Sequence, residues 1–318
     1  MSYKKMGYLL IPCLLAAGCS SASHGVGTGS DATAGSSDAK HNGSDGGTSN
    51  PMLFKFGIVG DTRPANEDDT PHYPTAIITK IWSDIAAASC DFAVSTGDYQ
   101  FSSPTGTQAG AQLDLYVTAR QQFSKPLYPA MGNHECTGYT DSNCGSGNAD
   151  GITNNYTAFT TRLLDPINQT KPYYVVNFAA PDQSWTAKLV IIAANAWDST
   201  QSTWLDTALS QATTYTFIVR HEDSYANTAP GVTPSDAIIA KYPYTLKIFG
   251  HTHTYAHYAS EHDVICGNGG APLTSGTNYG YGIVELLADG KVQFTDYDYS
   301  NDSVIDQFRL NADGSSAP

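Results

Sequence analysis

Short runs of β-branched, aromatic and other apolar residues recur along the chain, and each run stops at a cluster of polar residues. Runs of this length, bounded by turn-forming residues, are typical of buried β-strands. The sequence predicts six such strands before residue 250, at Leu53–Val59, Phe92–Ser95, Leu127–Met131, Leu189–Ala193, Thr216–Val219 and Leu246–Phe249.

In several of the intervals between these runs, the apolar residues are spaced as on one face of an α-helix. This spacing predicts helices at Thr75–Ala88, Trp204–Ala212 and Ser235–Tyr242. The first of them places four isoleucines and Trp82 on one face, as expected of an amphipathic helix packed on a core. The alternation of strands and helices predicts a layered α/β fold whose inner strands are mostly parallel.

The pattern changes after Ala271, where strands follow one another with turns between them. Three strands are predicted there, at Tyr281–Leu287, Val292–Tyr297 and Val304–Leu310, with a turn around Gly290. We expect these strands to form a second, partly antiparallel sheet.

The N-terminus has the features of an export signal. Lys4 and Lys5 precede an apolar run of about a dozen residues, too short for the roughly 20 that span a bilayer as a helix. The small residues before Cys19 resemble a bacterial lipobox, although Leu15 stands four places before the cysteine rather than three. We expect residues 1–19 to be a signal peptide, with membrane attachment only through a lipid on Cys19. Cleavage nearby, giving a secreted or periplasmic protein, is the alternative.

Residues 20–51 consist almost entirely of small and polar residues. Such a segment cannot bury enough apolar surface to offset the entropy lost on ordering, so it is predicted to be a flexible tether. The remaining residues, 52–318, suit one large domain. The net charge of −14 argues against nucleic acid as a partner, because phosphate backbones are bound through basic patches.

The cysteines that follow the signal peptide are Cys90, Cys136, Cys144 and Cys266, an even number for an oxidising compartment. Cys136 and Cys144 close a short polar loop, and we expect a disulfide between them. Cys90 and Cys266 border apolar runs, so they form either a second bridge or two buried thiols.

Polar clusters after the predicted strands carry the candidate chemistry. They are Gly60–Arg63, Gly97–Tyr99, Gly132–Glu135, His221–Asp223 and Gly250–His253. Taken singly, an aspartate after glycine is more typical of a turn or a helix cap, and His-Thr-His is more typical of a polar strand or loop. Together they would converge, because the carboxyl ends of strands in an open α/β sheet meet at one crevice. A mixed set of carboxylate, amide and imidazole ligands suits zinc, manganese or iron better than calcium or a thiolate metal.

These clusters occur in the order found in the calcineurin-like metallophosphoesterases, and the sequence resembles that superfamily. It includes purple acid phosphatases, protein phosphatases and cyclic nucleotide phosphodiesterases. Gly-Asn-His-Glu at 132–135 and Gly-His-Thr-His at 250–253 are the most specific parts of the resemblance. The resemblance implies a layered α/β/β/α sandwich of two mixed sheets flanked by helices.

The resemblance also implies roles for individual residues. Asp61 and His253 would bind a first metal ion, Asn133, His221 and His251 a second, and Asp98 would bridge the two, while His134 would donate a proton or contact phosphate. The implied reaction is hydrolysis of a small phosphomonoester or phosphodiester by a metal-activated water, using one or two ions of zinc, manganese or iron. The alternative is a metal- or phosphate-binding lipoprotein of the same fold with little or no turnover.

Arg63 is the main departure from the family, because it stands where many members have a histidine ligand of the first metal. An arginine cannot bind a metal in the usual way. It could clamp a substrate phosphate, or form a salt bridge to Asp61 or a surface carboxylate. Phe101 stands where purple acid phosphatases have a tyrosine ligand, and Tyr99 is expected to be structural.

Other residues near the clusters are expected to have supporting roles. Glu135 would fix its loop, and Glu222 would only end a strand. The glycines of 267–270 either shape the pocket rim or form a plain turn, and the segments Cys136–Asn155 and Tyr225–Pro234 would border the pocket.

Overall fold

The computed structural model describes residues 52–225, 228–274 and 276–318, which belong to one compact unit. The predicted signal peptide and lipid site at residues 1–19, and the predicted tether at 20–51, lie outside the described residues. None of the helices within the described ranges has the length and apolar character needed to cross a membrane.

The described strands form two sheets of six strands each. The first sheet has the order β12 (Val304–Leu310), β11 (Val292–Asp298), β10 (Gly280–Leu287), β1 (Met52–Val59), β2 (Phe92–Ser95) and β3 (Leu127–Pro129). The second has the order β4 (Tyr174–Ala179), β5 (Thr186–Ile191), β6 (Tyr215–Val219), β7 (Leu246–Phe249), β9 (Asp263–Cys266) and β8 (Tyr255–Tyr258). Each sheet contains a run of neighbouring parallel strands. In the first sheet these are β1, β2 and β3, and in the second they are β5, β6, β7 and β9.

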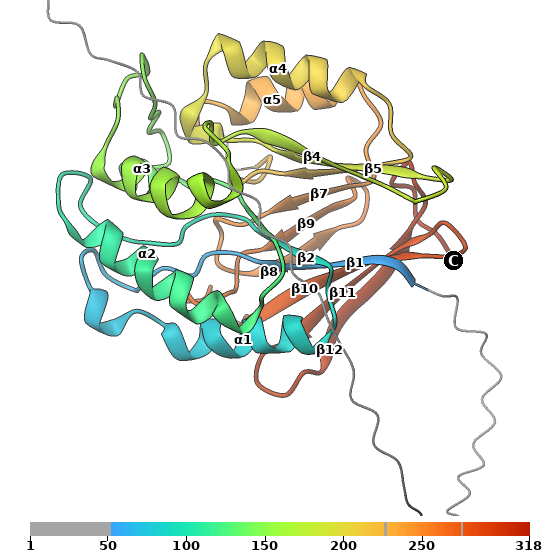
Figure 1. Cartoon of the computed structure of the whole chain (residues 1–318), viewed down its shortest axis with the longest axis horizontal. Coiled ribbons are helices and arrows are strands. Elements are labelled where there is room, and N and C mark those ends of the chain that lie inside the picture. Colours follow the sequence, from blue (N-terminus) through green and yellow to red (C-terminus); the bar gives the residue numbers. More distant parts are fainter. Residues whose placement is uncertain (1–51, 226–227, 275) are drawn as a thin grey trace, which may run out of the picture. The chain divides into compact units, whose positions relative to one another are not determined.

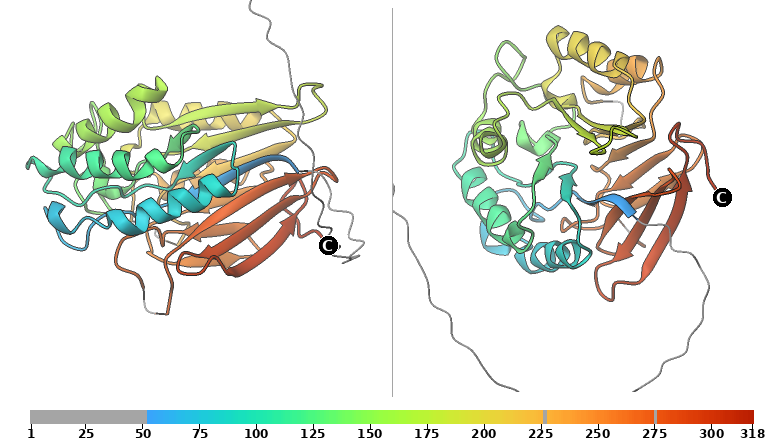
Figure 2. Two further views of the ribbon diagram at one scale, coloured as in Figure 1. Left: turned by 60° about the horizontal axis from the view of Figure 1, so that its bottom comes forward. Right: turned by 45° about the vertical axis from the view of Figure 1, so that its right-hand side comes forward.

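Helices cover the outer faces of the two sheets. The described α-helices are α1 (Thr75–Ala87), α2 (Gln108–Ala119), α3 (Asn154–Phe159), α4 (Ser199–Ser210) and α5 (Val232–Ile239). In Figures 1 and 2, α4 and α5 lie over the second sheet, whereas α1 and α2 lie on the opposite side against the first. The predicted layered α/β/β/α sandwich is therefore confirmed.

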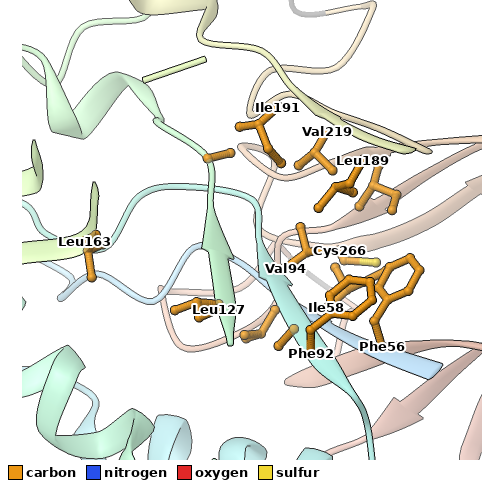
Figure 3. Close-up of a cluster of buried hydrophobic side chains, with 14 of the residues drawn as sticks. Phe56, Ile58, Phe92, Val94, Leu127, Leu163, Leu189, Ile191, Val219 and Cys266 are labelled. Carbon is orange, nitrogen blue, oxygen red and sulfur yellow. The ribbon is translucent and has the colours of Figure 1, made fainter. Parts of the chain in front are cut away.

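Aromatic and aliphatic side chains fill the space between the sheets. The ring of Phe56 on β1 stacks on Phe92 of β2 at a centroid distance of 4.9 Å, and meets Phe217 of β6 edge-on at 5.2 Å. Figure 3 shows apolar side chains from both sheets, among them Val94 and Leu189, gathered in this layer. This contact fixes one sheet against the other, and with it the loops that follow the strands of both.

The assignment of strands to sheets differs from the expectation. The three C-terminal strands do not form a second sheet, because β10 pairs antiparallel with β1 and so extends the first. The second sheet instead contains three of the six predicted early strands together with β4, β8 and β9, which the sequence pattern did not single out. Hydrophobic alternation identifies the buried face of a strand but not its neighbour in the sheet.

The structure shows which of the four cysteines are paired. Cys136 and Cys144 form the expected disulfide. Cys90 and Cys266 are buried free thiols, so the second bridge is not formed.

Candidate metal centre

The predicted site residues follow strands of both sheets and come together at one place. Asp61, Asp98 and Asn133 follow β1, β2 and β3 of the first sheet, and His221, His251 and His253 follow β6 and β7 of the second. Contacts of 3.0–3.8 Å connect these residues to one another and to Arg63 and His134. The structure therefore assembles all eight predicted site residues.

The backbone at four of these residues is in the left-handed region. The φ angles are 55° at Asp61, 57° at Asp98, 70° at His251 and 46° at His253. Residues other than glycine rarely adopt this region, and they keep such a conformation only where contacts with the surrounding structure stabilise it. Hydrogen bonds between the loops stabilise these conformations, for example the bond from the Asp61 amide to the Gly97 carbonyl at 3.0 Å. Four such residues in one cluster indicate a functional site.

Two glycines allow the loops to approach one another. A Cβ atom on Gly132 would lie 2.3 Å from Oδ1 of Asp98, and one on Gly250 would lie 2.4 Å from Oδ2 of Asp61. Both distances are far below van der Waals contact, so any side chain at either position would displace a carboxylate. Glycine at these two turns therefore leaves the room that the neighbouring carboxylates occupy.

Four lone-pair donors converge in what we call the His221 group: Asp98 Oδ1, Asn133 Oδ1, His221 Nε2 and His251 Nδ1. His221 Nε2 lies 3.2 Å from the Asp98 oxygen, 3.1 Å from the Asn133 oxygen and 3.3 Å from the His251 nitrogen. Asn133 is oriented by its Nδ2, which donates to the Gly138 carbonyl at 2.7 Å, so its oxygen faces the group. His221 Nδ1 donates to the Thr96 carbonyl at 2.9 Å, so Nε2 is the nitrogen that would offer a lone pair to a metal ion. Against the effect of burial, the Asp98 and Asp61 carboxylates raise the pKa of His221 well above its usual value, so a metal ion there would take the place of a proton.

The His221 group fits a transition-metal ion. Four acceptors facing one another repel unless a cation or a proton lies between them. Ligands at about 2.0–2.1 Å from a shared tetrahedral ion are separated by roughly 3.3 Å, close to the spacing observed here. Carboxylate, amide and imidazole ligands suit zinc, manganese or iron.

Glu222 is a further candidate ligand that the sequence reasoning missed. A carboxylate oxygen of Glu222 and ring nitrogens of His221 and His251 all lie within 4.8 Å of one another. The Glu222 side chain is fully buried, and neither of its carboxylate oxygens has a hydrogen-bond partner. Burial raises the pKa of Glu222 to about 7. A bound cation next to this carboxylate would supply the missing partner.

A second set of donors, the Asp61 group, consists of Asp61, Asp98 and His253. Their ligand atoms also lie within 4.8 Å of one another. His253 Nδ1 donates to the Pro272 carbonyl at 2.8 Å, so the lone pair of its Nε2 faces the group. Burial, only partly offset by His221, raises the pKa of Asp61 well above its usual value.

Arg63 lies within the Asp61 group. Its Nη2 donates to His253 Nε2 at 3.3 Å, and its Nε lies 3.6 Å from Oδ2 of Asp98. The guanidinium carbon is 4.8 Å from the centre of the Phe101 ring. The Asp61 group therefore already contains a cation of the protein, and as it stands it does not fit a metal ion as the His221 group does.

His134 also contacts Phe101. Its Nε2 is 3.8 Å from Oδ2 of Asp98, and its ring meets the Phe101 ring edge-on at 4.5 Å. Burial lowers the pKa of His134 to about 3, and its Nδ1 is buried without a hydrogen-bond partner. In this structure His134 is a neutral imidazole at neutral pH, which can donate a hydrogen bond from one ring nitrogen. The predicted role as a proton donor would need the charged imidazolium, which burial opposes, and that role stays a prediction.

Several neighbouring residues hold the loops in place. Glu135 accepts hydrogen bonds of 2.9 Å from the amides of Asp98, Tyr99 and Gly132, which confirms that it fixes its loop. The Tyr99 hydroxyl donates to the Ala130 carbonyl at 2.9 Å, as expected of a structural residue. The glycine run at 267–270 packs on the first loop, because the Gly269 amide donates to the Gly60 carbonyl at 2.9 Å.

Comparison with solved structures finds a similar fold in two other proteins. A purple acid phosphatase from yellow lupin (Lupinus luteus) seeds matches with a TM-score of 0.58 and 16% identity, over 80% of this chain and 53% of the lupin chain. A dimetal phosphatase from Danio rerio matches with a TM-score of 0.55 and 11% identity, over 82% of this chain and 100% of the other. At these identities the likeness shows the fold. This chain thus spans about half the length of the lupin enzyme.

No match was found among curated proteins. Residues 54–255, which are more than half of the chain and contain every predicted site residue, match the family described as calcineurin-like phosphoesterase. The chain therefore belongs to the calcineurin-like phosphoesterase family.

Proposed function

We propose that this protein is an exported, metal-dependent hydrolase of small phosphomonoesters or phosphodiesters. The family supports metal-dependent phosphoester hydrolysis. The observation that carries the proposal for this chain is the His221 group, in which four lone-pair donors converge at 3.1–3.3 Å.

The proposed metal ligands are those of the sequence prediction, with Asp98, Asn133, His221 and His251 as the principal set and Asp61 and His253 as further donors. A zinc, manganese or iron ion held there supplies Lewis-acid polarisation of a phosphoryl oxygen and makes a water molecule more acidic. The net negative charge of the chain does not oppose an anionic substrate at the site, because a bound cation determines the local potential.

Two residues beside the ligands are proposed to act on the substrate. The Arg63 side chain is 14% exposed, and its planar fork can donate to two oxygens of a phosphoryl group. His134, neutral in this structure, can donate a hydrogen bond to a phosphoryl or leaving oxygen. Both lie within 4 Å of Asp98 Oδ2, so they reach the same part of the site.

The proposal is tested by removing metal with a chelator, reloading with zinc, manganese or iron, and measuring hydrolysis of p-nitrophenyl phosphate and bis(p-nitrophenyl) phosphate. We expect turnover only in reloaded protein, and a loss of 100-fold or more in His251→Ala. His257→Ala is the matched control, because His257 bonds to Asp306 on the first sheet and is not in the site. Metal binding without turnover on any phosphoester would favour the binding-protein alternative.

Export and lipid attachment are supported by the sequence of residues 1–19. We expect the full chain, expressed in a bacterium, to fractionate with membranes, and Cys19→Ser to release it. Recovery of both forms in the same soluble fraction would contradict lipid attachment but not the proposed hydrolysis.

A further inference from the structure

We propose that this protein binds a single metal ion, in the His221 group, and that the Arg63 guanidinium takes the place of a second ion in the Asp61 group. This inference deepens the proposed function and rests on it for its catalytic meaning. It departs from the two-metal arrangement that the family resemblance implies.

The first argument is the contact between Arg63 and His253. Because the Pro272 carbonyl accepts from His253 Nδ1, the only lone pair with which the ring could bind a metal is on Nε2. Arg63 Nη2 lies 3.3 Å from that nitrogen and can only donate. The lone pair is therefore used in a hydrogen bond with the protein itself.

The second argument is that Arg63 is held in place from several sides. Its Nη1 donates to the Pro64 carbonyl at 3.1 Å, and its guanidinium packs on the Phe101 ring. Its Nε is buried, has no hydrogen-bond partner and faces Oδ2 of Asp98 at 3.6 Å. These contacts fix the guanidinium between the donors of the Asp61 group.

The third argument is the charge of the Asp61 group. Asp61 and Asp98 are both buried, at 0% and 1% exposure, and two buried carboxylates need a nearby positive charge or a bound proton. Arg63 supplies positive charge there within the covalent structure. A divalent ion in the same group would have to displace the guanidinium from its partners, or bind beside it against repulsion at a distance of a few ångströms.

The consequence for the reaction concerns the substrate phosphate. In this arrangement the phosphoryl group lies between the His221 group and the guanidinium. Arg63 then provides positive charge and directed N–H donors in place of a second Lewis acid, as arginine does at many phosphate sites.

The test counts metal ions and does not depend on turnover. Apo-protein is titrated with Mn²⁺ by equilibrium dialysis, and the bound ion is examined by electron paramagnetic resonance. We expect one tightly bound Mn²⁺ per chain with the six-line spectrum of an isolated ion. Arg63→His should bind two ions with a spin-coupled spectrum, whereas Arg309→His, at an arginine that bonds to Gln293 on the first sheet, should still bind one.

A pair of ligand variants gives a second test. His253→Ala should retain one tightly bound Mn²⁺, whereas His251→Ala or Asn133→Ala should bind it at least 100-fold more weakly. Circular dichroism checks that each variant is folded. Two tightly bound ions in the unaltered protein, or loss of an ion in His253→Ala, would overturn the inference and leave the proposed hydrolysis standing. One ion without turnover would count against the proposed function alone, and no bound metal at all would overturn both.

Discussion

At the scale of single residues, two buried carboxylates without hydrogen-bond partners have different surroundings. Glu222 lies beside the ring nitrogens of His221 and His251. Asp296, on β11, lies close to the carboxylates of Asp306 and Asp298. Because a buried polar group without a partner is costly, each implies a compensation elsewhere. For Glu222 the compensation that follows from the proposed site is a bound cation, and for Asp296, among like charges, it is a proton.

Glu222→Gln should weaken metal binding by about 10- to 100-fold, because it removes a buried negative charge next to the ligands. The measurement is competition for Zn²⁺ with a fluorescent chelator. Glu261→Gln, at an exposed glutamate, is the control and should leave the affinity unchanged. An unaltered affinity in a folded Glu222→Gln protein would show that this carboxylate does not contribute to the site.

Asp296→Asn should make the protein more stable at pH 8, with a difference that disappears toward pH 4. Burial raises the pKa of Asp296 well above its usual value of about 4, and the nearby carboxylates act in the same direction. The native state therefore binds this proton more tightly than the unfolded state does. The stability that results is complete below about pH 4 and is lost as the pH rises through the native pKa. Asparagine does not ionise and loses nothing in this range.

Urea unfolding of both proteins between pH 4 and pH 8 measures the difference. Asp298→Asn provides a comparison of opposite sign, because hydrogen bonds from Ser300 lower the pKa of Asp298. The loss in free energy of unfolding caused by Asp298→Asn should be largest at high pH and should vanish as the pH falls. Parallel pH profiles for Asp296→Asn and the unaltered protein would refute the assignment of a buried, protonated Asp296.

At the scale of elements, the sequence predicted regular strands well and helix ends less well. The predicted bounds of β2, β7 and β12 are those observed. The predicted helix at Trp204 in fact begins at Ser199, because the Asp198 side chain caps it by accepting from the Gln201 amide at 2.6 Å. Apolar spacing starts only where a helix reaches the core, whereas a polar cap sets its true beginning.

Helix α2 was missed for a related reason. Its buried positions include Gln112, which bonds to both the amide and the carbonyl of Phe101. A polar residue on the buried face interrupts the apolar pattern from which a helix is predicted. The same limitation explains why Glu222 was not predicted as a metal ligand, since the sequence gives no sign that a glutamate after a strand is buried.

The loops of the site depend on Glu135, and Glu135→Gln should lower the free energy of unfolding by about 2–4 kcal/mol. The carboxylate accepts three backbone N–H groups from the loops after β2 and β3. A glutamine has one acceptor oxygen, and its NH₂ group would face at least one of these donors. Chemical unfolding measures the loss. Glu285→Gln, which breaks a partly exposed ion pair with Lys55, should cost less than about 1 kcal/mol, and an equal loss in both variants would contradict the argument.

At the scale of the whole described unit, the site is shared between the two sheets. The order of the polar clusters was sufficient to predict which residues meet, because each follows a strand and strand ends converge. It was not sufficient to predict that β10 extends the first sheet, since that pairing joins Lys55 to Glu285 across most of the sequence. Nor could it show that Arg63 points into the site, which depends on contacts with Phe101 and His253.

Because ligands come from both sheets, the packing between the sheets should control metal affinity as well as stability. Phe217 on β6 lies four residues before His221. It is 2% exposed and packs edge-on against Phe56 of β1. Phe217→Ala should lower the free energy of unfolding by about 3–5 kcal/mol through lost burial and the resulting cavity. It should also weaken Zn²⁺ binding, because His221 would no longer be fixed relative to Asp98. Val304→Ala, at a position 53% exposed on β12, should change neither quantity appreciably. A destabilised Phe217→Ala protein with unchanged metal affinity would mean that hydrogen bonds between the loops, rather than the packing of the sheets, position the ligands.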